Sequence, residues 1–282
     1  MNFNKSTSIL TFIFVLATLP AMAQVKGAII TNKQPFAIGE TVYFTSEILH
    51  ENRALNIYLP LGYEENIEKN YPVIYLLDGS SNEDFIHISG LVQFASFSWI
   101  NIMPETIVVG IANVDRKRDF TYPSNSVRDK LEYPMAGESN AFIQFIENEV
   151  QPLINTTYRV TSEKTLIGQS LGGLLATEIL FKHPALFNNY IIVSPSLWWD
   201  DESLLAYSPK KRTTPTSIYL AVGKEGPTME QLAYKLKNKL EASKDGSSKI
   251  YFNFLQAQNH GDALHLAAYD AFEKIFKQAT KK

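Results

Sequence analysis

Hydrophobic residues along the chain gather in short runs that separate longer segments with helical spacing. A run that is apolar at every position is typical of a parallel strand buried on both faces of a sheet. Strands of this kind are predicted at 71–77, 106–111, 190–194, 217–222 and 250–255, with one more directly before Gly168. Helices are predicted between them at 85–97, 138–153, 174–181, 229–240 and 263–276.

Two β-rich segments, 41–49 and 54–59, precede this alternating series and are separated by a polar turn at 50–53. They predict an antiparallel hairpin. Strands that alternate with helices form a mainly parallel sheet with helices on both faces. The pattern therefore predicts one α/β domain that opens with a hairpin, and 282 residues are enough to bury its core.

Residues 113–137 lack this periodicity and carry many charges, two prolines and a glycine. We predict a long loop here, and a long loop in a compact domain is often functional. Arg116 and Arg118 follow a buried strand, so one hypothesis is that they line the mouth of a site and hold a polar or anionic part of a substrate. The alternative is a solvated loop in which they pair with Asp115 and Asp119.

The N-terminus has the three parts of a secretory signal peptide. Lys5 supplies a positive charge, 9–19 is apolar, and Ala21-Met22-Ala23 is a small-x-small cleavage signal. The apolar run is about half of the roughly 20 residues that a membrane-spanning helix needs, which disfavours the alternative of a stable membrane anchor. We therefore expect cleavage of 1–23 and a single domain at 24–282, located in the periplasm or secreted.

Composition excludes several classes of function. The net charge of −3 gives no reason to expect binding of nucleic acid or of an anionic membrane. The absence of cysteine rules out disulfides, a cysteine nucleophile and thiolate metal sites. No metal or other cofactor is expected.

A G-x-S-x-G motif lies at 168–172, between an apolar run and a helix-forming run. A strand that turns sharply into a helix holds its turn residue in strained backbone angles, and nearby glycines remove side chains that would clash. The pattern favours Ser170 as an exposed nucleophile. An ordinary glycine-rich turn is the alternative, and the flanking strand and helix argue against it.

A serine nucleophile needs a base and, in many enzymes, an acid that orients the base. His260 lies in a polar loop directly after the last predicted strand and is favoured as the base over His265, which lies inside the following helix. Glu225 comes two residues after Gly223, at the end of the preceding strand, and is the favoured acid. Glu230 is the alternative acid.

Two backbone amides are predicted to stabilise the oxyanion that forms during attack. One is the N–H of Leu171, at the start of the helix that follows the nucleophile. The other is the N–H of Ser80, in the loop after the strand at 71–77, where Gly79 lets the chain turn.

Several stretches together are similar to a known family. They are 71–79, 113–121, 167–173, 194–199 and 259–262, within a resemblance that covers about 40–280. The chain resembles the enterochelin-esterase-like esterases of the α/β-hydrolase superfamily, which are related to feruloyl esterases and bacterial mycolyltransferases. The resemblance implies an α/β-hydrolase fold, Ser170 as nucleophile, His260 as base, and oxyanion amides after Asp78-Gly79 and after Ser170.

The sequence departs from this family at Gln169, where His is common, and at Asp262, where Ser is common. Neither change removes a catalytic group. Some members of the family function with a poorly placed acid or none, so the resemblance leaves the role of Glu225 open.

The function predicted from these features is an exported serine hydrolase that cleaves carboxylic esters through an acyl-enzyme. An acyltransferase with the same triad is the main alternative, and a non-catalytic binding protein is disfavoured because nucleophile and base are both present. The resemblance suggests a siderophore lactone, or an acetyl or feruloyl ester on a polysaccharide, as substrate. Trp198, Trp199 and Phe120 are candidates for stacking on a sugar or catechol ring, or they are core residues.

Overall fold

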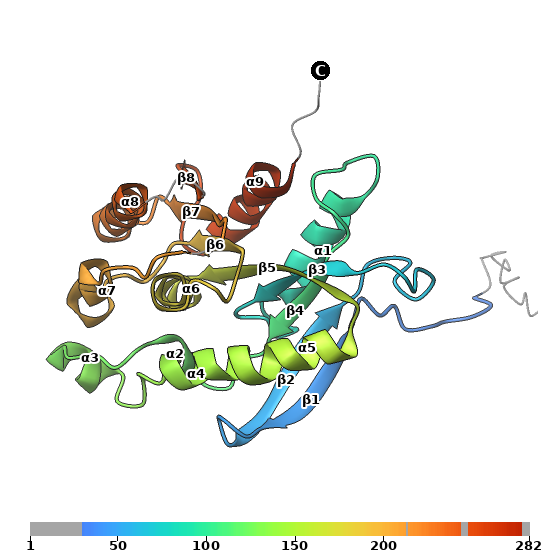
Figure 1. Ribbon diagram of the computed structural model, residues 1–282, viewed down its shortest axis with the longest axis horizontal. Helices are drawn as coiled ribbons and strands as arrows, with labels where there is room; N and C mark the ends of the chain where they lie inside the picture. The colour runs from blue at the N-terminus through green and yellow to red at the C-terminus, as the bar shows by residue number, and fades with distance from the viewer. Residues whose placement is uncertain (1–29, 213, 244–247, 278–282) are drawn as a thin grey trace, which may run out of the picture. The chain divides into compact units, whose positions relative to one another are not determined.

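A computed structural model describes residues 30–212, 214–243 and 248–277. Within them, eight strands form one sheet in the order β1-β2-β4-β3-β5-β6-β7-β8 (Figure 1). The strands are β1 (Glu40–Ser46), β2 (Glu51–Tyr58), β3 (Tyr71–Leu76), β4 (Ile107–Ile111), β5 (Val160–Gln169), β6 (Asn189–Val193), β7 (Ser217–Gly223) and β8 (Lys249–Leu255).

The sheet is parallel except at its first edge. β1 pairs antiparallel with β2, and β2 pairs antiparallel with β4, whereas all pairings from β4 through β3 to β8 are parallel. The turn of the hairpin contains His50 in the left-handed region, with φ of 53°. The predicted α/β-hydrolase architecture, a mainly parallel sheet that opens with an antiparallel hairpin, is confirmed.

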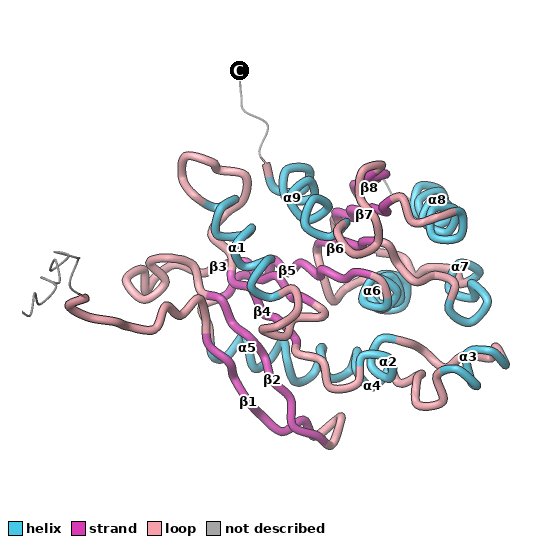
Figure 2. Tube along the Cα trace, turned by 180° about the vertical axis from the view of Figure 1, so that it is seen from behind, coloured by secondary structure: helices cyan, strands magenta, loops and turns pink. Residues whose placement is uncertain are grey.

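Helices cover both faces of the sheet. They are α1 (Phe85–Ser96), α2 (Arg116–Phe120), α3 (Val127–Glu132), α4 (Ser139–Phe145), α5 (Gln151–Thr157), α6 (Leu171–Lys182), α7 (Ser203–Ala206), α8 (Pro227–Ala242) and α9 (Ala263–Phe276). Figures 1 and 2 show α1 and α9 side by side, and they share one hydrophobic core. Helices α4, α5, α6 and α8 contribute to the core on the opposite face.

The alternation of side chains along β3 explains its continuous apolar run. Val73 and Tyr75 belong to the core under α4, α5, α6 and α8, whereas Ile74 and Leu76 belong to the core under α1 and α9. A strand with helices on both faces must be apolar at every position. The carboxyl ends of the parallel strands meet at one edge, where open α/β sheets carry their sites.

The predicted long loop at 113–137 is wrong in part, because it contains α2 and α3. The Asp115 side chain caps α2 by accepting from the amides of Lys117 at 3.1 Å and Arg118 at 3.0 Å. These helices are too short to show a hydrophobic period, which is why the pattern did not reveal them.

The predicted helix at 138–153 is also interrupted. A π-helical turn, η1 (Ile146–Val150), joins α4 to α5. Within this turn, Glu149 accepts hydrogen bonds from the amides of Glu47 at 2.8 Å and Ile48 at 3.0 Å, at the tip of the hairpin. The turn therefore connects α4 and α5 to the antiparallel edge of the sheet.

The described residues from Ala37 onward form one compact unit. The predicted signal peptide at 1–23 lies outside the described residues. In the part of the chain that is described, no helix combines the length and the apolar character needed to cross a bilayer.

Candidate active site

Ser170 occupies a strained turn between β5 and α6. Its φ of 58° and ψ of −119° are unusual for a residue with a side chain. A Cβ on Gly168 would lie 2.4 Å from the carbonyl oxygen of Gly172, so only glycine fits there. A Cβ on Gly173 would lie 3.0 Å from the Pro195 Cα. Close backbone packing on both sides therefore presents the serine at the edge of the sheet.

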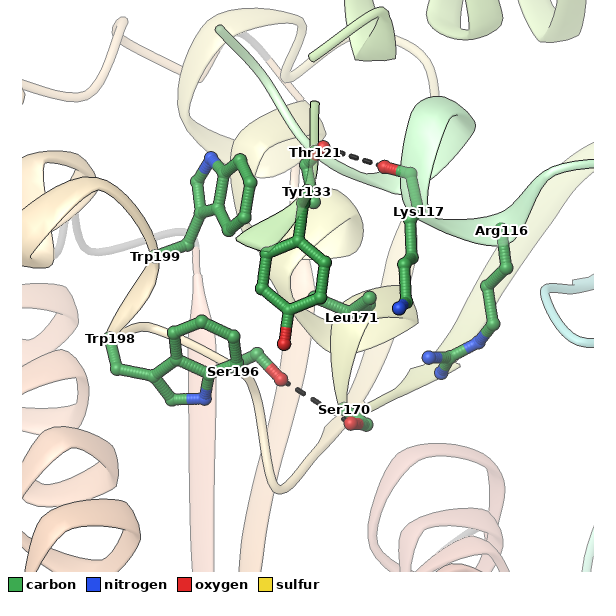
Figure 3. Close-up of a pocket in the computed structure, with 9 residues that line it drawn as sticks. All are labelled: Arg116, Lys117, Thr121, Tyr133, Ser170, Leu171, Ser196, Trp198 and Trp199. Atoms are coloured by element: carbon green, nitrogen blue, oxygen red, sulfur yellow. Dashed lines mark hydrogen bonds between the residues drawn. The ribbon is translucent and has the colours of Figure 1, made fainter. Parts of the chain in front are cut away.

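Two cavities meet at Ser170. One has a volume of about 410 Å³ and is lined by Asp78, Glu83, Asp84, Arg116, Gln169, Ser170, His260 and Gly261. The other, of about 170 Å³, is lined by Arg116, Lys117, Thr121, Tyr133, Ser170, Leu171, Ser196, Trp198 and Trp199 (Figure 3). The Ser170 hydroxyl lies 3.3 Å from the Ser196 hydroxyl in this structure.

The larger cavity has an acidic wall. Burial first, and then the charges of Asp78 and Glu83, raise the pKa of Asp84 to about 6. The Arg116 guanidinium opposes this shift. Asp84 therefore changes charge in the mildly acidic range, in the cavity that Ser170 also lines.

Glu225 and His260 form a close pair at the same edge of the sheet. His260 Nδ1 lies 2.5 Å from Glu225 Oε2. The other carboxylate oxygen of Glu225 accepts from the Ser194 hydroxyl and from the Gly223 amide, the latter at 2.9 Å. The Glu225 side chain is 2% exposed and the His260 side chain 47%, so a buried acid holds a histidine that faces the cavity.

The hydrogen bonds to Glu225 decide its charge. Burial on its own would raise the pKa of this carboxyl, but the bonds from His260, Ser194 and the Gly223 amide outweigh it and hold the pKa below its ordinary value. Glu225 therefore stays ionised at neutral pH, in the form that can orient an imidazole and stabilise imidazolium.

The alternative acid and base lie elsewhere. Glu230 accepts from the Gly226 amide at 3.0 Å, at the start of α8. His265 lies in α9, where its ring packs edge-on against His87 with 5.6 Å between the centroids. The structure thus brings together Ser170, His260 and Glu225, the three residues favoured from the sequence.

Gln169 contributes a contact that the sequence did not reveal. Its side-chain Nε2 donates to the carbonyl oxygen of His260 at 2.5 Å. The residue before the nucleophile thereby holds the loop that carries the base. The resemblance marked Gln169 as a departure from the family, but its partner is 91 residues away and only the fold brings the two together.

The two predicted oxyanion amides are in different situations. Leu171 begins α6 and lines the smaller cavity beside Ser170. The Ser80 amide donates to Glu83 Oε2 at 3.2 Å, and Ser80 lines neither cavity at the serine. An oxyanion role for Ser80 requires this bond to be exchanged, and it stays a prediction.

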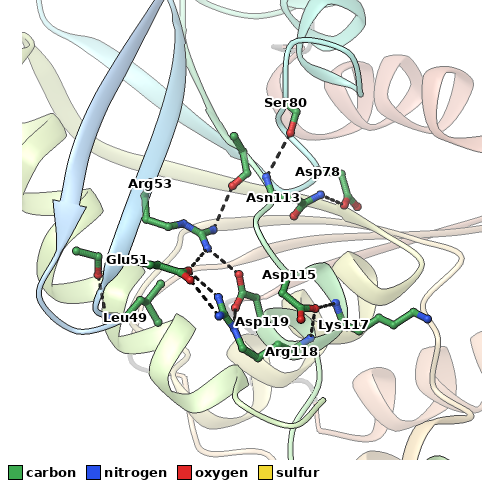
Figure 4. A network of polar contacts seen from close by, with 12 residues as sticks. Leu49, Glu51, Arg53, Asp78, Ser80, Asn113, Asp115, Lys117, Arg118 and Asp119 are labelled. Carbon is green, nitrogen blue, oxygen red and sulfur yellow. Dashed lines mark hydrogen bonds and ion pairs between the residues drawn. The ribbon is translucent and has the colours of Figure 1, made fainter. Parts of the chain in front are cut away.

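The structure brings Arg116 to the site but not Arg118. Arg116 lines both cavities. Arg118 instead donates to Glu51 Oε2 at 3.0 Å and to Asp119 Oδ1 at 2.8 Å (Figure 4). Arg53 joins this buried network through Asp119 Oδ2 at 2.9 Å, so the network ties α2 to the hairpin. The alternative of a solvated loop predicted the pairing of Arg118 with Asp119, but Asp119 is 1% exposed, so the loop is not solvated there. Arg116 pairs with Asp78 instead, and Glu51 is a partner of Arg118 that the sequence did not suggest.

Comparison with known proteins gives the family of the chain. Residues 46–279 match the family described as "Putative esterase". The chain belongs to this esterase family. Ferri-bacillibactin esterase BesA of Bacillus subtilis (strain 168) is 31% identical over 192 residues, 62% of this chain and 66% of that protein, or just under two thirds of its length.

Two solved structures are similar to the esterase over most of its length. An IroE-like serine hydrolase from Shewanella oneidensis has a TM-score of 0.76 at 27% identity, covering 84% of this chain and 80% of that one. The BES protein from Bacillus cereus has a TM-score of 0.74 at 25% identity, covering 88% and 98%. Both support the α/β-hydrolase fold, and the first is described as a serine hydrolase.

The smaller cavity of the esterase has aromatic walls. Trp198 is half-buried and lines this cavity. Trp199 and Phe120 are buried, and Trp199 Nε1 donates to the Tyr122 carbonyl at 2.8 Å, as expected of core residues. Tyr133, which the sequence analysis did not single out, also lines the cavity. Lys117 Nζ lies 4.5 Å from the centre of the Tyr133 ring and places a positive charge beside these aromatic rings.

Among the described residues, no group of three or more histidine, aspartate or glutamate side chains has the geometry to hold a metal ion.

Proposed function

We propose that the esterase hydrolyses carboxylic esters through an acyl-enzyme on Ser170, with His260 as general base and Glu225 as the acid that orients it. The observation that carries the proposal is the Glu225–His260 pair, 2.5 Å apart, at the cavity onto which Ser170 opens. The strained turn of Ser170 between β5 and α6 adds support, since a serine nucleophile occupies such a turn in this fold.

The mechanism begins with proton transfer. The Ser170 hydroxyl must turn from Ser196 toward His260, a rotation about one side-chain bond. The Ser170 oxygen then attacks the ester carbonyl while the free ring nitrogen of His260 takes its proton, and Glu225 stabilises the imidazolium through Nδ1–H. Backbone amides, with Leu171 as the first candidate, stabilise the oxyanion.

Collapse of the tetrahedral intermediate expels the alcohol, which takes the proton from His260 and leaves an acyl group on Ser170. Water then enters, His260 removes its proton, and the same sequence releases the carboxylic acid. A hydrolase differs from an acyltransferase only in this second half. In an acyltransferase, an alcohol takes the place of water and accepts the acyl group.

We propose a small-molecule ester of the siderophore type as the natural substrate. The support is a relative named for the cleavage of ferri-bacillibactin, together with the aromatic cavity that contains Lys117 beside Tyr133. Aromatic walls with the cations Lys117 and Arg116 favour a planar ring that carries an acidic hydroxyl or carboxylate.

Replacement of the nucleophile tests the mechanism. We expect Ser170→Ala to lower kcat for p-nitrophenyl acetate by about 10⁶, and His260→Ala to be comparably damaging, because the two act as one unit. The double variant should be no worse than either single variant, and Tm should stay near that of the wild type. Ser170→Ala activity above a tenth of the wild type would refute the assignment, and loss of activity in His265→Ala but not in His260→Ala would place the base on α9.

Export is part of the proposal. Its support is the signal-peptide pattern at 1–23. Expression of the full chain in a bacterial host, followed by fractionation and N-terminal sequencing, tests it. We expect a periplasmic or secreted product that begins at Gln24, and an uncleaved cytosolic product would contradict it.

A further inference from the structure

Arg116 connects the segments after β3 and β4 to the last residue of β5, and these three strands are neighbours in the sheet. From the first turn of α2, its Nε donates to Asp78 Oδ1 at 2.5 Å and its Nη2 to Asp78 Oδ2 at 2.9 Å. Nη2 also donates to the carbonyl of Gln169, directly before the nucleophile, at 3.3 Å. A guanidinium that engages both oxygens of a carboxylate fixes the plane of that carboxylate as well as its distance.

Asp78 is held in a conformation that needs such support. Its φ of 54° lies in the left-handed region, which is costly for a residue with a side chain. Its carbonyl accepts from the Asp84 amide at 3.1 Å, and Oδ1 also accepts from the Asn113 side chain at 2.7 Å. The next residue, Gly79, donates to the Ile111 carbonyl at 3.1 Å. The loop after β3 is therefore fixed from several directions.

The carboxylate of Asp78 packs directly on the nucleophile turn. A Cβ on Gly172 would lie 3.3 Å from Asp78 Oδ2 and 3.4 Å from the Leu77 Cβ. Gly168 is required by the backbone of the turn itself, whereas Gly172 leaves room for this carboxylate. The last glycine of the G-x-S-x-G motif thus serves the contact between the loop after β3 and α6.

The ion pair is largely removed from water. The side chains of Asp78 and Arg116 are 10% and 33% exposed. The Arg116 guanidinium also lies 5.6 Å from the centre of the Phe120 ring, which limits its freedom. Removing either partner leaves the other charge partly buried without its counterion.

We infer that Arg116 and Asp78 are a positioning pair that fixes the loop after β3 against the nucleophile turn. The pair sets the distance between Ser170 and the backbone of the loop after β3, which carries the second predicted oxyanion amide, that of Ser80. This inference rests on the proposed function and assigns Arg116 a structural task in catalysis, in place of the substrate contact considered from the sequence. The amides carry the stabilisation, and the pair acts through them.

The two roles differ in kinetics. A substrate-binding arginine raises KM for anionic substrates and leaves a small neutral ester unaffected. A positioning arginine lowers kcat for every ester, including p-nitrophenyl acetate, because the geometry of the transition state changes. It also weakens binding of phenylboronic acid, which forms a tetrahedral adduct with a serine oxygen.

The experiment compares Arg116→Gln, Arg116→Lys, Asp78→Asn and the Arg116→Gln/Asp78→Asn double variant. Each is tested with p-nitrophenyl acetate and phenylboronic acid, with Tm measured alongside. We expect kcat to fall by about 10–100-fold in Arg116→Gln and Asp78→Asn, with KM within about 3-fold. The phenylboronic acid inhibition constant should rise in parallel. Arg116→Lys should recover only part of the loss, because an ammonium cannot engage both oxygens in a plane.

The double variant should be no worse than the poorer single variant, because both remove one ion pair. Arg128→Gln is the matched control: this arginine is 73% exposed on α3 and should leave kcat unchanged. Folded Arg116 variants with wild-type kcat would overturn the inference alone, as would a rise in KM limited to anionic esters. A wild-type protein that turns over no ester and binds no phenylboronic acid would overturn the proposed function as well.

Discussion

The nucleophile and the base are held in place by different means. Ser170 is positioned by backbone packing, with glycines in contact with main-chain atoms on both sides of the turn. His260 lies on an exposed loop and is positioned by polar contacts, from Glu225 to its ring and from Gln169 to its carbonyl. The first arrangement tolerates almost no added atom, whereas the second depends on particular hydrogen bonds. Substitutions at the glycines of the nucleophile turn should therefore affect folding, and substitutions at the polar partners of the histidine should affect rate.

The largest expected effect tests the packing of the nucleophile turn. In Gly168→Ala the new Cβ would meet the Gly172 carbonyl at 2.4 Å, so the turn must distort. We expect a loss of about 3 kcal/mol or more in the free energy of unfolding, with Tm lower by at least about 6 °C. Gly261→Ala, in the histidine loop, places its Cβ 3.3 Å from the Asn259 side chain and should change Tm by less than about 2 °C. An equal fall in Tm in both variants would show that the nucleophile turn is packed no more tightly than the histidine loop.

The next effect tests the polar contacts of the base. Glu225→Gln keeps the shape of the side chain but replaces the carboxylate that accepts from the His260 Nδ1–H with a neutral amide. We expect kcat for p-nitrophenyl acetate to fall by about 10²–10⁴, with little change in Tm. The control Ser194→Ala removes a different hydrogen bond to the same carboxylate and should cost about 3-fold or less in kcat. A Glu225→Gln variant within 3-fold of the wild type would show that the esterase needs no acid.

A smaller effect is expected from Gln169→Ala, which frees the carbonyl of His260. The loop should become less ordered, lowering kcat by about 3–10-fold while KM and Tm stay close to the wild type. Gln93→Ala makes the same chemical change on the exposed side of α1 and should alter none of these values. A kcat for Gln169→Ala that matches Gln93→Ala would show that Glu225 alone positions the base.

The smallest effect concerns the acidic wall of the larger cavity. The pKa of Asp84 rises to about 6 in the folded chain from 3.8, so the folded state binds its proton more tightly. The stability that this proton supplies is complete below pH 3.8 and is lost as the pH rises through 6. Asp84→Asn should therefore raise Tm by about 1–3 °C at pH 7.5, and should not raise it at pH 4. The Asp84 side chain makes no capping hydrogen bond to α1, so replacing it with asparagine removes no such bond. The same change in Tm at both pH values would exclude this cause.

Much of the fold could be predicted from the sequence, because two-sided burial forces apolar residues at every position of a central strand. The strand predicted at 71–77 agrees with β3 (Tyr71–Leu76), and the helix at 263–276 with α9. The short helices α2 and α3 could not be predicted in this way, since five or six residues show no period. The π-helical turn at Ile146–Val150 was hidden for the opposite reason, because its apolar spacing continues that of the flanking helices.

The candidate site divides in a similar way. Ser170, His260 and Glu225 could be chosen because each follows a strand that ends at the same edge of the sheet. The pairing of Arg118 with Asp119 could be named as an alternative because the two are adjacent, but Asp78 could not be assigned as the partner of Arg116, since it follows a different strand 38 residues earlier. Arg118 pairs with Glu51, 67 residues earlier in the chain, and this contact depends on where the hairpin packs. The likeness to the esterase family supplied the fold and the order of the residues, but not these contacts.

The two cavities that meet at Ser170 bear on the order in which products leave. On the proposed mechanism, Ser170 holds the acyl group of the ester while the alcohol departs. Because two cavities meet at Ser170, the alcohol can leave through one of them without passing the acyl group in the other. The cavity that the alcohol has left then admits water to the acyl-enzyme. Substitutions in the cavity that holds the acyl group should alter the deacylation step. Substitutions in the cavity that holds the departing alcohol should alter the acylation step. Pre-steady-state burst measurements on variants of each wall would show which cavity serves which half of the ester.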